Sequence, residues 1–354
     1  ALVMLMTPGL GLFYGGLVRK KNVLSTLMHS YFILCLIAIV WALWGYSLAF
    51  GGTGRFIGNL DFIGLRDVGV EPGATGVPTM VFMFFQMMFA IISVALISGA
   101  FAERKNFKAF IVFAVLWSTL VYSVVCHWVW APGGWLYEYG AMDFAGGTVV
   151  HIASGVTALV AAIVIGRRVG VEKEGVTPHD IPMTLIGAGL LWFGWYGFNA
   201  GSALAADGLA ANAFVVTTLA AAAAGLSWVS VAWMRTGKPS VLGTGVGAVA
   251  GLVAAPEIFA VLEAWNPAEG RVLAGQIFGG VLARMHPVLY TAAAVMLVTL
   301  TIRRLLGPRP VAYGVRATII AVMFGLALAS GFGISPRVEA MQRAIGGPVA
   351  ALPD

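Results

Sequence analysis

The sequence is poor in charged residues and in cysteine. Only 10% of its 354 residues are charged and 60% are hydrophobic, whereas a soluble domain carries about 25% charged residues. The two cysteines, Cys35 and Cys126, lie within or beside apolar runs and lack metal-ligand spacing. These deficits exclude a disulfide framework, a cysteine metal site and a string of soluble domains. They predict one all-α, polytopic membrane unit over residues 1–354.

Motifs for catalysis are also missing. The sequence contains no HExxH, CxxC or P-loop motif, and no GxSxG motif accompanied by a suitable triad. We therefore expect neither enzyme activity nor a cofactor. The formal net charge of +6 does not indicate a nucleic-acid partner, because the basic residues lie mainly in short loops between apolar runs.

Apolar runs predict the membrane spans. Before residue 256 they cover 1–17, 26–50, 79–102, 107–130, 145–166, 183–202, 209–234 and 239–255. The chain opens inside an apolar run, so we expect the front of the first span to be missing. Farther on, 271–302 is favoured as one span kinked at Pro287, ahead of two separate spans, and 311–334 is the last. We expect about 10–11 spans, with the runs from 1 and from 183 beginning two halves of an inverted repeat.

Basic residues are concentrated in alternate loops, which predicts the orientation. Arg19-Lys20-Lys21, Arg104-Lys105, Arg167-Arg168 and Arg235 with Lys238 mark one set of loops. The other set holds only Arg55 and Arg66. The excess of positive charge predicts that the first set is cytoplasmic. The chain is thus expected to be a multi-pass protein of the cell membrane, with its N-terminus outside and His151 reached from the exterior.

The stretch from Asp143 to His151 combines polar residues with the start of a span. Asp143 can cap free N–H groups and meet the positive end of a helix dipole, and Gly146 and Gly147 permit close helix packing. His151 lies six residues beyond Ala145, about 9 Å along a helix axis. An ionisable residue at that depth usually faces protein or a pathway. The alternative is a buried histidine that bonds to a neighbour's hydroxyl or carbonyl.

Four aromatic side chains in the spans could bind a small cation. Phe85 and Phe89 are spaced i, i+4 and share a helix face. Trp130 ends the fourth span and Trp195 lies in the sixth, whose outer end carries the hydroxyl acceptor of Ser202. Aromatic faces attract cations by about 0.5–2 kcal/mol. The alternative is ordinary aromatic packing and an interfacial tryptophan belt.

The order of several motifs resembles the ammonium transporter (Amt/Mep) family. The matching stretches are 6–10, 12–22, 99–104, 143–151, 194–202 and 237–240, and they cover residues 1 to about 255. The 143–151 stretch favours the Amt/Mep branch over the Rhesus branch. Residues 256–354 depart from the family pattern, as divergent or rearranged sequence.

The resemblance implies an eleven-span homotrimer with one pore per subunit, for ammonium and ammonia. It implies an outer ammonium site with a gate below it, the first of two pore histidines, and an acidic residue that supports the site electrostatically. The outer site would consist of Phe89, Trp130 and Ser202. The gate would be Phe85 and Phe198, with Trp195 beside the pore. His151 would be the first pore histidine, and Asp143 the acidic residue. A PII-type signalling protein is the cytoplasmic partner that the resemblance suggests.

The second pore histidine of the family is not recognisable. Its Gly-x-His-Gly setting does not occur, and His286, in Arg284-Met285-His286-Pro287, does not match it. The leading hypothesis is ammonium transport, with recruitment and deprotonation at an outer aromatic site and passage through an apolar pore. The alternatives are a non-conducting ammonium-binding sensor or regulatory relative, and an inactive fragment.

Overall fold

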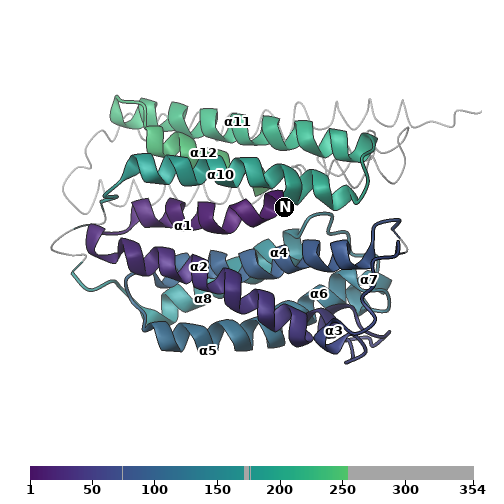
Figure 1. The fold of residues 1–354 in the computed structure, drawn as a ribbon. Coiled ribbons are helices and arrows are strands. Elements are labelled where there is room, and N and C mark those ends of the chain that lie inside the picture. Colours follow the sequence, from purple (N-terminus) through teal and green to yellow (C-terminus); the bar gives the residue numbers. More distant parts are fainter. Residues whose placement is uncertain (74, 171–174, 176, 254–354) are drawn as a thin grey trace, which may run out of the picture. The chain divides into compact units, whose positions relative to one another are not determined.

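A computed structural model describes residues 1–73, 75–170, 175 and 177–253. Apart from one isolated bridge between Pro72 and Pro78, the regular secondary structure of these residues is helical. Figure 1 shows the helices lying roughly side by side. They are α1 (Met6–Leu17), α2 (Val23–Val40), α3 (Tyr46–Phe50), α4 (Thr79–Ile97), α5 (Phe107–Trp117), α6 (Ser123–Trp130), α7 (Trp135–Glu138), α8 (Ala153–Ile165), α10 (Ile181–Asn199), α11 (Gly208–Thr236) and α12 (Val241–Val253).

The predicted spans up to residue 255 are confirmed as helices. Short 3-10 and π turns join neighbouring segments, which gives six spans: 20–50, 79–101, 107–138, 147–165, 181–203 and 208–236. Two shorter apolar helices, 2–17 and 241–253, match the first and eighth runs. The fold is therefore a polytopic membrane bundle, as expected. The predicted spans 271–302 and 311–334 lie outside the described residues.

Helices α1 and α10 pack closely along their length, and Figure 1 shows them next to each other. Glycine makes this approach possible. A Cβ atom on Gly16 would overlap the Thr184 hydroxyl and the Asp180 carbonyl, and a Cβ atom on Gly187 would overlap the backbone of Phe13. The small-residue faces thus bring together the first spans of the two predicted halves.

Three of the basic loops meet at one end of the bundle. The backbone N–H of Arg19 donates to Glu103 at 2.7 Å, and the Arg19 guanidinium pairs with the same carboxylate at 3.0 Å. Arg168 approaches it at 3.9 Å. The Glu103 side chain is only 2% exposed, and its contacts with Arg19 and Arg168 tie together the loops after α1, α4 and α8. The alternation of loops inferred from charge is therefore present in the fold, while the side of the membrane stays a prediction.

Lys105, in the loop between α4 and α5, is half-buried between two aromatic rings. Its Nζ lies 3.6 Å from the centroid of Phe101 and 3.2 Å from that of Phe110. No hydrogen-bond partner for Nζ is found among the described residues. Burial lowers the pKa of Lys105 to about 6, because removal from water penalises the charged form.

Candidate functional site

The carboxylate of Asp143 caps the span that contains His151. Its Oδ1 accepts from the N–H groups of Gly146 and Gly147 at 2.6 and 2.9 Å, and its Oδ2 accepts from Thr148 and Val149 at 2.8 and 3.0 Å. A helix leaves its first four N–H groups without intrahelical partners, so one side chain satisfies four such donors. The predicted cap is confirmed, and both carboxylate oxygens are engaged in it.

The first turn of this span is wider than an α-helical turn. Gly147–Ile152 is π-helical, and the His151 N–H donates to the Gly146 carbonyl at 2.9 Å. Gly146 adopts φ 94°, and a Cβ there would clash with Val150. Glycine is therefore required at the point where the chain enters the turn. Single π turns occur frequently at functional sites, and here the turn carries His151.

Ring contacts form a continuous aromatic column from the end of α6 to His151. The Phe89 centroid lies 5.6 Å from that of Trp130 and 4.3 Å from that of Phe198. Phe198 lies 5.6 Å from His151. His151 in turn stacks on Trp195, with centroids 5.7 Å apart and planes 11° from parallel. Residues from α4, α6, α10 and the π turn are thus brought to one path.

The predicted gate residues Phe85 and Phe198 each pack on Phe89. Phe198 packs on Phe89, whereas Phe85 contacts Phe89 at 4.8 Å and lies against Gly201. Phe89 is 1% exposed, and Phe85 is only partly buried. Phe85 lies one helical turn closer to the start of α4 than Phe89, and the gate pair of Phe85 and Phe198 stays a prediction.

Two polar groups orient the mouth of the column. The Trp130 Nε1–H donates to the Asp143 carbonyl oxygen at 2.8 Å, which fixes the indole beside the cap. The Ser202 hydroxyl donates to the Phe198 carbonyl at 2.7 Å. Because its proton is used, the oxygen of Ser202 keeps lone pairs that can accept from a ligand. The arrangement of both groups indicates a site for a small ligand that donates hydrogen bonds.

The imidazole of His151 is only partly satisfied. Its Nε2 is buried, and the described residues offer it no hydrogen-bond partner. By contrast, ring nitrogens of His127 and His179 contact the backbone carbonyls of Ala49 and Val18 at 2.8 and 2.9 Å. His151 therefore has a ring nitrogen free to exchange a proton or bind a ligand. No cluster of His, Cys, Asp or Glu suited to a metal occurs in the part of the chain that the structure describes.

Sequence reasoning missed the polar contacts that hold α10 next to this column. Asn199 Nδ2 donates to Thr217 Oγ1 at 3.0 Å and to the Leu252 carbonyl at 3.3 Å. The side chain thereby joins α10 to α11 and α12. An asparagine in the middle of an apolar run is the signal that could have indicated it, since a buried amide needs partners.

Comparison with known proteins gives a consistent picture. The model of the Ammonium Transporter Family matches residues 1–277, beyond the boundary near 255 expected from motifs. An ammonium transporter of Bacillus subtilis is 54% identical over 72% of this chain and 62% of its own length. Ammonium transporter Amt1 of Archaeoglobus fulgidus is 49% identical, over 72% of this chain and 63% of its own. The chain thus spans less than two thirds of the length of these relatives.

Solved structures of other proteins are also similar to this chain. Candida albicans Mep2 matches with a TM-score of 0.67 and 42% identity, over 71% of this chain and 57% of that one. A structure described as a sensor Amt protein matches with a TM-score of 0.67 and 25% identity, over 97% of this chain and 90% of that one.

Proposed function

Because this chain belongs to the ammonium transporter (Amt/Mep) family, we propose that it recruits ammonium at the outer end of the aromatic column and passes ammonia along it. The observation that carries the proposal is the unbroken series of ring contacts from Trp130 to His151. An aromatic face attracts a desolvated cation by about 2 kcal/mol. The series would therefore both attract ammonium and exclude water below.

The proposed recruitment site combines Trp130, Phe85, Phe89 and Ser202. The indole of Trp130 is held by the backbone beside Asp143, so its ring is positioned before the ion arrives. The Ser202 oxygen would replace one water of hydration by accepting an N–H of ammonium. Asp143 would act through space, because its carboxylate oxygens already accept four backbone N–H groups.

The contact between Phe89 and Phe198 would force ammonium to lose its proton. With centroids 4.3 Å apart, these rings would block an aqueous route at that level, and an ion is expensive in such surroundings. Neutral ammonia crosses an apolar passage more readily. We propose that these two rings, in place of the Phe85–Phe198 pair, form the gate, and that His151 lies directly beneath it.

Conduction of charge is the point at which the candidate functions differ. The family's second pore histidine is not recognisable in the sequence, and one histidine does not complete a two-site proton relay. We propose that ammonium binds at the outer site while ammonium-driven current is small or absent. A non-conducting sensor or regulatory role is therefore the second candidate. A homotrimer and a cytoplasmic PII-type partner remain proposals from the family resemblance, and an external N-terminus remains a proposal from the distribution of basic residues between loops.

Two measurements on the same preparations test the proposal. Ammonium binding in detergent should weaken in Trp130→Ala and change little in Trp135→Ala, a tryptophan at the start of α7 that packs on Trp128. Current on ammonium addition to reconstituted liposomes should be small in the unmodified protein, and His151→Ala should leave binding nearly unchanged. Equal binding losses in both tryptophan variants would refute the site. A strong current abolished by His151→Ala would show a working relay and refute the non-conducting assignment.

A further inference from the structure

Three consecutive carbonyl groups in the loop after α3 are bonded to groups of α6 and α7. Figure 1 shows these three helices at the same end of the bundle, and α6 packs on both of the others. The bonds, in chain order, join the Gly54 carbonyl to His127 Nε2, the Arg55 carbonyl to the Trp135 N–H at 3.0 Å, and the Phe56 carbonyl to the Trp128 Nε1–H at 2.7 Å. The loop segment 54–56 is thereby fixed against the helix that ends in Trp130.

Both ring nitrogens of His127 face carbonyl oxygens. The residue is fully buried, with Nδ1 lying 2.8 Å from the Ala49 carbonyl and Nε2 contacting the Gly54 carbonyl. A carbonyl oxygen only accepts hydrogen bonds, and a neutral imidazole has one N–H and one lone pair. In a neutral ring, one of the two contacts would therefore place a lone pair against an oxygen. Only the imidazolium, which has two N–H groups, satisfies both partners.

The position of the ring suits a positive charge. Ala49 lies in the last turn of the span 20–50, where free carbonyl groups form the negative end of the helix dipole. A cation is stabilised at such an end, and hydrogen bonds from a charged donor are stronger than those from a neutral one. Two bonds of this kind offset part of the cost of removing the charge from water.

Carboxylates on the neighbouring segments are bonded to other groups. Asp61 accepts from Asn59 Nδ2, Glu138 accepts from the Gly133 N–H at 3.1 Å, and Asp143 caps the π turn. The other titratable groups on α6, on the elements packed against it and in the segment 54–56 are Tyr46, Arg55, Tyr122, Cys126, Tyr137 and His151. Among the described residues, the hydrogen-bond partners of the His127 ring are thus carbonyl oxygens.

The last turn of α6 connects His127 to the proposed recruitment site. The Ala131 N–H donates to the His127 carbonyl at 3.2 Å and closes the turn that carries Trp130. The chain then returns so near to this turn that a Cβ atom on Gly134 would overlap the same carbonyl. Movement of His127 would therefore displace the turn in which the Trp130 indole is held.

We propose that His127 is a positioning residue that carries two ring protons, joins the end of α3 and the segment 54–56 to α6, and so holds Trp130 in place to bind ammonium. The effect on ammonium rests on the proposed recruitment function, whereas the charge of the ring rests on its two carbonyl partners. The role of His127 is indirect, because Trp130 would contact the ion.

Nitrogen NMR of the full chain with isotope-labelled histidine, in mild detergent near pH 7, counts the ring protons. The His127 signals are those that disappear in His127→Asn, and they should show two ring N–H groups. A single N–H, with a lone pair on the other nitrogen, would overturn the proposal. This measurement needs no ammonium and no folded variant other than the one used for assignment.

Asparagine and glutamine separate the two bonds of the ring. In His127→Asn the amide nitrogen occupies the place of Nδ1, so the bond to Ala49 is kept and the bond to Gly54 is lost. In His127→Gln the amide nitrogen reaches the place of Nε2 and keeps the bond to Gly54. Trypsin cleavage after Arg55 should therefore accelerate about tenfold in His127→Asn, and less than about twofold in His127→Gln. Cleavage after Arg66, in the same loop, should stay unchanged in both.

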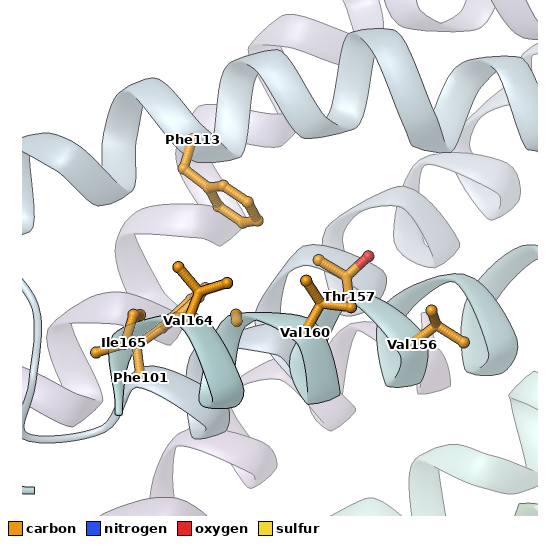
Figure 2. Close-up of a pocket in the computed structure, with 8 residues that line it drawn as sticks. Phe101, Phe113, Val156, Thr157, Val160, Val164 and Ile165 are labelled. Atoms are coloured by element: carbon orange, nitrogen blue, oxygen red, sulfur yellow. The ribbon is translucent and has the colours of Figure 1, made fainter. Parts of the chain in front are cut away.

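Ammonium binding to the same variants tests the positioning role. His127→Asn should weaken binding about tenfold, and His127→Gln should restore most of it. Phe113→Leu is the control, because it changes the same span at an apolar groove between α5 and α8, into which Figure 2 shows the Phe113 ring pointing. It should alter neither the cleavage after Arg55 nor the binding.

Equal cleavage and equal binding in the asparagine and glutamine variants would refute the positioning role. If His127→Asn does not fold, Trp128→Phe removes the neighbouring bond to Phe56 and should accelerate cleavage after Arg55 and weaken binding; no change in either would equally refute it. If the unmodified protein binds no ammonium, the recruitment function fails, while the proton count and the cleavage rates still decide whether a doubly protonated His127 holds the segment 54–56.

Discussion

Replacing Asp143 by asparagine should destabilise the protein far more than the same change at another helix cap. The carboxylate accepts four backbone N–H groups. An asparagine amide offers one acceptor oxygen and places an NH₂ group against the other two donors. Two bonds are lost, and the remaining two become neutral ones.

The size of the effect follows from the bonds involved. Hydrogen bonds to a charged group contribute about 1.5–3 kcal/mol each, against about 1 kcal/mol for neutral ones. Losing two and weakening two therefore costs about 4 kcal/mol at the lower end of that range. With about 2 °C per kcal/mol for a large domain, Tm should fall by roughly 8 °C.

Asp207→Asn provides the matched control. Asp207 caps α11 through one bond, to the Ala210 N–H at 3.0 Å, and asparagine is as good as aspartate at such a cap. Its Tm should stay within about 1 °C of the unmodified protein. Thermal unfolding in mild detergent, followed by tryptophan fluorescence, measures both variants. Equal Tm changes at the two positions would refute the four-bond account of Asp143.

Three further variants test other parts of the fold by the same unfolding assay. Lys105→Met should raise Tm at pH 7, because the folded pKa of about 6 lies below the unfolded value of about 10.4. Between these two pKa values, folding forces Lys105 to release its proton, which lowers the stability of the unmodified protein. The Tm gain of Lys105→Met should therefore shrink as pH rises to 10.5. Glu103→Gln should lower Tm at pH 7. Burial raises the pKa of Glu103, but its hydrogen bonds outweigh this effect and hold the pKa below its usual range. The stability that the carboxylate adds should therefore begin to be lost below about pH 4.3 and disappear once pH falls below the folded pKa. Gly16→Ala should abolish folded protein, since its Cβ would overlap Thr184. In Gly15→Ala the Cβ meets the Met183 sulfur at 3.4 Å and the Leu27 side chain at 3.6 Å, which are ordinary contact distances, so this variant should be tolerated.

The spans were predictable because the membrane imposes length and composition on each of them separately. A run such as 79–102 must be helical, since lipid offers no partners for exposed backbone groups, and the observed span is Thr79–Phe101. The cap was predictable for a similar reason, because Asp143 acts on N–H groups within a few residues of itself. Local rules of this kind need no knowledge of neighbouring helices.

The interior arrangement was less accessible because it depends on how separate helices align in depth. Periodicity places Phe85 and Phe89 on one face of α4, but it does not say which of them meets Phe198. The π turn at Gly147–Ile152 and the position of Lys105 between two rings are equally invisible in hydropathy. Each depends on contacts between residues far apart in the sequence.

Depth along the helices explains why the structure selects Phe89 for the contact with Phe198. Phe89 lies ten residues into α4, about 15 Å from its start, and Phe85 lies about 9 Å from it. Phe198 lies four residues before Ser202 and contacts His151, so its ring stands at the depth of the π turn. Only the deeper phenylalanine reaches that level. The shallower one remains beside Gly201, where it would add a second aromatic face to the proposed recruitment site.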